Sequence, residues 1–99
     1  MNDFVRPSLY GAYHEIYEGN NKNDKIKTDI VGPICETADC FGESRLLSRM
    51  TNGDLLAISH TGAYGYSMAS HYNLRKKPVE LLINKENKIE VINEQLGYE

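Results

Sequence analysis

The stretch at residues 30–39, IVGPICETAD, places the strongest constraint on how this chain can fold. It begins as an apolar run, reaches a break at Gly32 and Pro33, and then sets the thiol of Cys35 beside the carboxylate of Glu36. Neighbouring side chains on a strand point to opposite faces, so this pair can act together only where the backbone bends. Gly32 and Pro33 permit that bend. Because a lone cysteine is often a small buried hydrophobe and a glutamate is usually solvated, the pair alone does not establish a site.

The size and charge of the chain limit its possible functions. Its 99 residues suit one domain with one modest core, because a chain of this length buries only about 60–65% of its unfolded surface. Eleven Lys and Arg against fourteen Asp and Glu give a net charge of −3, and the largest basic cluster is Arg75-Lys76-Lys77. Nucleic-acid binding is therefore disfavoured. With no apolar run of about 20 residues and no signal-peptide pattern, we expect a soluble cytoplasmic protein with no membrane partner.

The cysteines and histidines do not predict a metal site. Cys35 and Cys40 stand five positions apart, and there is no further cysteine to complete a zinc-type set of four ligands. His14, His60 and His71 are scattered along the chain. Without a secretory context, we expect both thiols to be reduced rather than joined in a disulfide.

The first third of the chain predicts one helical turn and two strands. Pro7 suits the start of a short helical turn over residues 8–10, which Gly11 closes. Aromatic and branched residues favour a strand at 13–17, and an extended pattern returns at 26–34. We expect these two strands to pair in antiparallel fashion.

The middle of the chain is harder to assign. Residues 18–25 are polar and rich in Asn, which is typical of a loop, and residues 37–50 predict a loop with about one turn of helix. A turn is indicated at Asn52-Gly53-Asp54. The apolar run at 55–58 predicts a strand that is buried on both faces.

The last part of the chain predicts a loop, a hairpin and a frayed end. Residues 62–73 are dense in Gly, Ser and Tyr, which suits either a ligand-contacting loop or a tightly packed connection. Residues 78–83 and 89–92 predict a hairpin, and we expect residues 93–99 to fray. The expected architecture is mainly β, with about five strands and one or two short helical turns.

Three segments together closely resemble the C-terminal part of the diaminopimelate decarboxylase family. They are RPSLYGAYH at residues 6–14, GPICETAD at 32–39 and GAYGYSM at 62–68, in the family's order and at similar spacings. The resemblance covers nearly the whole chain and weakens over residues 18–25 and after Ile83.

The resemblance implies both a fold and an activity. The family has an N-terminal α/β barrel that carries pyridoxal 5'-phosphate on a lysine, followed by a C-terminal β-domain. It converts meso-diaminopimelate to L-lysine and CO2 as a homodimer whose active sites draw on both subunits. We expect residues 1–99 to be a single domain, most of that second part, with a Greek-key-like β-barrel or sheet and with the N-terminal barrel absent. The family's β-domain takes a further strand from the start of the full-length chain, so this portion alone would be incomplete.

The same resemblance assigns the site residues. Cys35 is implied to donate the proton that follows decarboxylation, across the dimer interface, and an ordinary thiol with a pKa near 8.5 is mostly protonated at neutral pH. Arg6 and Tyr10 are implied to contact a substrate carboxylate, a task suited to a guanidinium. Glu36 is implied to pair with the distal ammonium, and Tyr64 to reach both cofactor and substrate. An Asp commonly follows the cysteine in ornithine-type relatives, so Glu36 and Arg6 favour diaminopimelate.

None of the lysines resembles the lysine that binds the cofactor in the family. They are Lys22, Lys25, Lys27, Lys76, Lys77, Lys85 and Lys88, all in polar surroundings. We therefore expect the chain alone to be inactive and not to hold the cofactor covalently. Two alternatives stay open: a non-catalytic β-domain that associates with a decarboxylase subunit, and a portion of a related ornithine- or arginine-type decarboxylase.

Overall fold

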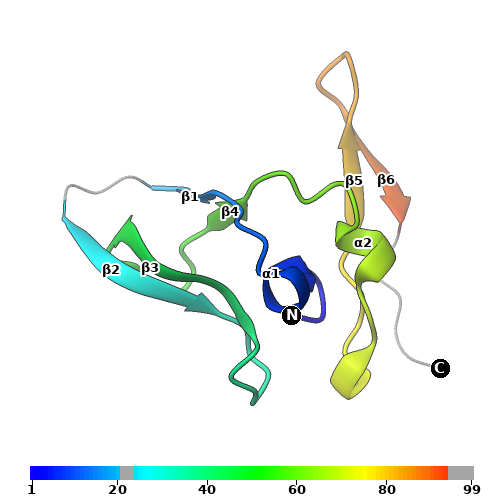
Figure 1. Ribbon diagram of the computed structural model, residues 1–99. Coiled ribbons are helices and arrows are strands. Elements are labelled where there is room, and N and C mark those ends of the chain that lie inside the picture. Colours follow the sequence, from blue (N-terminus) through cyan, green and yellow to red (C-terminus); the bar gives the residue numbers. More distant parts are fainter. Residues whose placement is uncertain (21–23, 94–99) are drawn as a thin grey trace. The chain divides into compact units, whose positions relative to one another are not determined.

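The computed structural model describes residues 1–20 and 24–93 (Figure 1). The elements are, in chain order, α1 (Arg6–Tyr10), β1 (Ile16–Glu18), β2 (Lys25–Val31), β3 (Cys40–Ser48), β4 (Leu56–Ile58), α2 (Gly65–Met68), the 3-10 helix η1 (Tyr72–Leu74), β5 (Glu80–Ile83) and β6 (Ile89–Asn93). They group into two compact units. The first is formed by Met1 and Arg6–Thr61, and the second by Asn2–Val5 and the chain from Gly62 onward. The predicted mainly β class with short helices is confirmed.

The β2–β3 ribbon is the largest sheet of the first unit (Figure 1). The two strands are antiparallel, with Lys25 opposite Ser48 and Val31 opposite Cys40. The predicted loop with a helical turn over residues 37–50 is therefore wrong. Ser44 explains the error, because its left-handed backbone (φ 52°) and the shifts in register interrupt the alternation by which a strand is recognised.

β1 pairs with β4, and the predicted pairing of residues 13–17 with 26–34 is wrong. The antiparallel register sets Ile16 opposite Ile58 and Glu18 opposite Leu56. Gly19 extends the pair, because its N–H donates to the Leu55 carbonyl oxygen at 2.9 Å. Strands adjacent in sequence pair often but not always, and a three-residue strand carries little information about its partner.

The strand predicted at residues 55–58 is confirmed, but its predicted burial on both faces is wrong. Leu55 is 75% exposed and Leu56 is 38% exposed. The reason is that β4 belongs to a two-stranded sheet, in which β1 covers one of its edges rather than its faces. The turn predicted at Asn52-Gly53-Asp54 is confirmed, with Gly53 at φ +92°.

Residues at the very start of the chain join the second unit. The Ser70 N–H donates to the Asn2 carbonyl oxygen at 3.0 Å, and the Asn2 side-chain amide donates to the Tyr72 carbonyl oxygen. Phe4 and Ala69 are buried. These contacts join segments that lie about seventy positions apart.

The hairpin predicted near the end of the chain is confirmed. β5 and β6 are antiparallel, with Leu81 opposite Val91 and Ile83 opposite Ile89. Asn84 shapes the connecting loop, because its side-chain oxygen accepts two backbone N–H groups of that loop. The strands number six in the described part of the chain, one more than expected. The expected fraying at 93–99 falls almost entirely outside the described residues, and the loop expected at 18–25 falls partly outside them.

Glu18, at the end of β1, contacts both strands of the β2–β3 ribbon. Its side chain is 6% exposed, and Oε1 accepts hydrogen bonds from Lys25 Nζ at 2.9 Å and from the Ser48 N–H at 2.8 Å. These bonds, the one from Lys25 first, lower the pKa of the Glu18 carboxyl from its ordinary value of 4.5 to about 2. The carboxylate therefore links the end of β1 to both strands of the ribbon.

This shift makes the stability of the first unit depend on pH. Because the pKa of Glu18 in the folded chain, about 2, lies below its unfolded value of 4.5, its stabilising effect is complete above the unfolded value and is lost as the pH falls towards 2. We expect Glu18→Gln to lower the free energy of unfolding at pH 7, and the difference from wild type to shrink between pH 4.5 and pH 2. Denaturant titrations across this range measure it.

Glu86→Gln is the matched control. Glu86 and Lys88 are about three-quarters exposed, and their ion pair is 3.7 Å long. Such surface pairs contribute little, so the control should unfold as wild type does at every pH. A loss of stability in Glu18→Gln that stays constant down to pH 2 would contradict the role of the Glu18 charge.

Candidate functional site

Cys35 and Glu36 lie on the exposed loop between β2 and β3. The backbone bends over residues 33–36, which confirms the bend predicted at the Gly-Pro break. The loop closes on itself, because the Gly32 N–H donates to the Asp39 carbonyl oxygen at 2.9 Å and the Glu36 N–H donates to the Ile34 carbonyl oxygen at 2.8 Å. Both the thiol and the carboxylate of the pair belong to exposed residues.

The side chain of Asp39 fills the inside of this loop. It is fully buried, and its Oδ2 accepts the Ile34 N–H at 2.8 Å while Oδ1 accepts the Met1 amino group. These donors offset the cost of burying a carboxylate. A Cβ at Gly32 would stand 2.3 Å from both carboxylate oxygens of Asp39. The loop therefore needs a residue without a side chain at position 32.

The short helix α1 carries the second predicted pair. The Arg6 guanidinium lies 5.4 Å from the centre of the Tyr10 ring, since residues four apart on a helix share a face. Gly11 ends the helix in a left-handed conformation, φ +63°. Ser8 ties α1 to the loop, because its hydroxyl donates to the Ala38 carbonyl oxygen.

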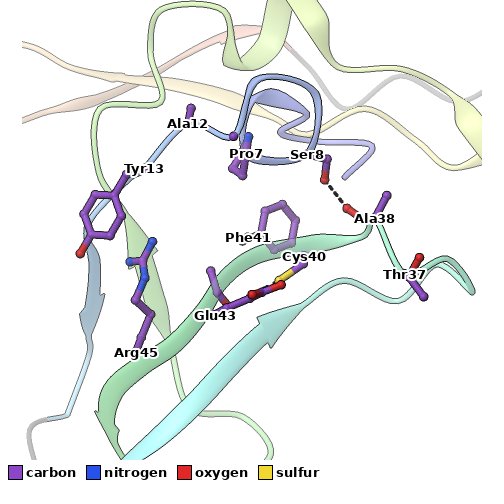
Figure 2. A pocket seen from close by; sticks show the side chains of 12 residues that line it. Pro7, Ser8, Ala12, Tyr13, Thr37, Ala38, Cys40, Phe41, Glu43 and Arg45 are labelled. Atoms are coloured by element: carbon purple, nitrogen blue, oxygen red, sulfur yellow. Dashed lines mark hydrogen bonds between the residues drawn. The ribbon is translucent and has the colours of Figure 1, made fainter.

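A cavity of about 440 Å³ lies beside α1 and this loop in the first unit (Figure 2). Its wall includes Arg45, whose guanidinium lies 4.0 Å from the centre of the Tyr13 ring and donates to the His14 carbonyl oxygen at 2.8 Å. Glu43 adds a carboxylate to the lining. The lining includes Ser8 and residues 37–38 but none of the predicted site residues. The cavity is thus a neighbour of the site rather than its centre.

Tyr64, the fifth predicted site residue, belongs to the second unit. It is 61% exposed and precedes α2 with a left-handed backbone, φ 64° and ψ 8°. A bulky residue rarely adopts this conformation, and such strained positions cluster at functional sites. Among the predicted site residues, the structure thus brings the Arg6 guanidinium to the Tyr10 ring.

Comparison with known proteins shows the family to which this chain belongs. The family described as "Pyridoxal-dependent decarboxylase, C-terminal sheet domain" matches residues 1–62. The chain belongs to this decarboxylase family.

Several members of the family are similar over the whole chain. The diaminopimelate decarboxylases of Campylobacter jejuni and Aquifex aeolicus are 43% and 41% identical to it, and each alignment spans 100% of this chain and 24% of the relative. The crystal structure of diaminopimelate decarboxylase from M. jannaschii matches 97% of this chain and 22% of its own, with 44% identity and a TM-score of 0.91. The Helicobacter pylori enzyme complexed with L-lysine matches 96% of this chain and 23% of its own, with 45% identity and a TM-score of 0.88. The chain thus spans about a quarter of the length of these relatives.

One residue of this decarboxylase domain, Tyr64, has an exposure that suits a contact with pyridoxal phosphate. The exposed phenol of Tyr64 can contact a cofactor that another segment presents. Two of the lysines contact other side chains: Lys25 is bound to Glu18, and Lys77 lies over the Tyr66 ring at 5.5 Å. In residues 1–20 and 24–93, no three His, Cys, Asp or Glu side chains gather as metal ligands, and no helix has the length and apolar character of a membrane span.

Sequence reasoning missed the roles of two residues, Asp39 in the loop and Ser8 on α1. Both lie inside segments that resemble the family, but neither was given a role there. The presence of Asp39 in a predicted loop was the available signal, because Asp side chains often hydrogen-bond backbone groups in turns. Nothing local predicts the bond from Ser8 to Ala38, since it joins residues thirty positions apart.

We expect Gly32→Ala to destabilise the first unit. The added Cβ would overlap the buried Asp39 carboxylate, and overpacking of this kind costs about 1–3 kcal/mol. Denaturant unfolding at pH 7 measures the loss. Gly62→Ala is the control, because a Cβ there meets nothing within 4 Å, and it should change the free energy of unfolding by less than about 0.5 kcal/mol. Equal effects of the two substitutions would refute the steric role of Gly32.

Proposed function

We propose that this chain is the C-terminal portion of a two-domain, pyridoxal-phosphate-dependent diaminopimelate decarboxylase that converts meso-2,6-diaminopimelate to L-lysine and CO2. The barrel that binds the cofactor is the N-terminal part of that enzyme. The observation that carries the proposal is the exposed Cys35–Glu36 loop, within a domain that belongs to the decarboxylase family and is 43% identical to a diaminopimelate decarboxylase.

Cys35 acts as the proton donor in the proposed reaction. Pyridoxal phosphate, when bound, supplies the electron sink for the electron pair that departing CO2 leaves behind. The thiol S–H bond then breaks, a C–H bond forms at that carbon, and the thiolate recovers a proton from solvent. The exposed position of Cys35 supports this role, because a group that completes a partner subunit's active site must stand on the surface of its own subunit.

The other four residues bind substrate and cofactor. Arg6 binds a carboxylate of the substrate through the planar donors of its guanidinium, which lies 5.4 Å from the centre of the Tyr10 ring. Glu36 pairs with the distal ammonium, and Tyr64 contacts both the cofactor and the substrate. The enzyme acts in the cytoplasm as a homodimer. Each active site then combines Cys35 and Glu36 of one subunit with the cofactor-bearing barrel of the other.

A second function is favoured by the surface of the β5–β6 hairpin. Four apolar side chains on one face of it, Leu81, Ile83, Ile89 and Val91, are each at least half exposed. An exposed apolar sheet face of this kind marks an association surface. The chain could therefore be a non-catalytic β-domain that associates with a decarboxylase subunit.

Reconstitution tests the first function. We expect the wild-type chain to make no lysine alone, and to make lysine when mixed with pyridoxal phosphate, diaminopimelate and the N-terminal part of a related diaminopimelate decarboxylase. Cys35→Ala should lower kcat about 100-fold, the smaller end of the range for general acids. Cys40→Ala, the second free thiol, should stay within about twofold of wild type. Lysine formation by the chain alone, or undiminished activity in Cys35→Ala, would refute the proposal.

Light scattering coupled to size-exclusion chromatography tests the second function. A non-catalytic association domain should co-elute with a decarboxylase subunit and should not raise its lysine formation. Leu81→Lys, which places a charge on the apolar face, should abolish the co-elution, while Lys85→Glu in the exposed loop should not. A monomer without affinity for the decarboxylase would rule this function out.

A further inference from the structure

We propose that Asp39 is the positioning residue of the candidate site, and that its buried carboxylate holds the β2–β3 loop so that Cys35 and Glu36 are presented in one fixed geometry. The part of this inference that concerns proton transfer rests on the proposed function. The part that concerns the loop rests on the structure of this chain alone.

Asp39 bonds to residues that precede and follow Cys35 in the chain. Its carbonyl oxygen accepts the Gly32 N–H at 2.9 Å, and its Oδ2 accepts the Ile34 N–H at 2.8 Å. Its own N–H donates to the Glu36 carbonyl oxygen at 3.1 Å. One residue therefore bonds to the backbone of Ile34 and of Glu36, the neighbours of Cys35 on either side.

The packing of the loop points to the same role. The Asp39 side chain is fully buried, whereas Cys35 and Glu36 are exposed. The carboxylate occupies space that a Cβ at Gly32 would enter, because that Cβ would lie 2.3 Å from the Asp39 oxygens. A buried carboxylate is costly unless backbone donors satisfy it, so the loop is stable mainly in the form that keeps these bonds.

The chemistry of the proposed site depends on that form. A general acid must stand within hydrogen-bond reach of the carbon that it protonates, and a displacement of about 1 Å can lower a rate about 100-fold. Glu36 on the same loop must also meet the distal ammonium. Loss of the Asp39 carboxylate should therefore have two effects at once. It should lower kcat because Cys35 is displaced, and it should raise KM because Glu36 is displaced.

A double-mutant cycle in the full-length decarboxylase that contains this chain tests the inference. We expect Asp39→Ala to lower kcat about 10- to 100-fold and to raise KM in the wild-type background. In the Cys35→Ala background, the same substitution should lower kcat less than about twofold, because a residue that acts through Cys35 has no effect on kcat once the thiol is gone. Equal losses in the two backgrounds, or no loss in either, would overturn the proposal.

Two further variants keep the test decisive. Should Asp39→Ala fail to fold, Asp39→Asn preserves the packing but loses the charge-assisted bond to Ile34, so kcat should fall at least about threefold, again only when Cys35 is present. A wild-type kcat in Asp39→Asn would overturn the proposal. Asp54→Asn is the matched control, because the Asp54 carboxylate also accepts a backbone N–H, from Thr51 at 2.8 Å, in a turn without site residues. It should leave kcat and KM unchanged.

Amide hydrogen exchange of the 99-residue chain separates this inference from the proposed function. We expect the Ile34 N–H to exchange at least about tenfold faster in Asp39→Ala than in wild type, and no faster in Asp54→Asn. A wild-type full-length protein that makes no lysine would refute the proposed function, and the exchange rate of Ile34 would still decide whether Asp39 holds the loop. An unchanged rate would overturn the inference.

Discussion

The first unit depends on a carboxylate that is buried at the turn of its main ribbon. β2 and β3 can join only if the chain reverses between Val31 and Cys40, and this reversal is built around the Asp39 side chain. Backbone donors offset the cost of burying this carboxylate, and the absence of a side chain at Gly32 leaves room for it. As a result, a loop with little apolar content has a defined shape and carries two exposed reactive groups on its outer side.

A second buried carboxylate organises the other end of the same unit. Glu18 joins β1 to the ribbon through Lys25 and Ser48, while the apolar core consists of few side chains, among them Ile16 and Leu47. Charge and hydrogen bonding thus stabilise this unit where a longer domain would be stabilised by a larger apolar core. A domain so lightly cored, with an exposed apolar hairpin in its second unit, suits the proposed role as one part of a larger enzyme.

Local chemistry accounts for the parts of the fold and site that the sequence predicted. The turn at Gly53, the end of α1 at Gly11 and the β5–β6 hairpin depend on neighbouring residues, so each was found. The contact of the Arg6 guanidinium with the Tyr10 ring is equally local, because residues four apart on a helix are neighbours. β3 was missed because the left-handed residue Ser44 sits inside it, and its alternation fails there.

The sequence by itself determined the family, the mainly β class, the bend that exposes Cys35 and Glu36, and the short-range turns. Only the tertiary structure decided that β1 pairs with β4, that Asn2 bonds to Ser70, and that Asp39 lies inside the loop. The physical reason is that turns and caps are stabilised by bonds between near neighbours, whereas strand partners and buried carboxylates are chosen by contacts between distant segments. Those contacts exist only once the chain has folded, and no pattern of adjacent residues records them.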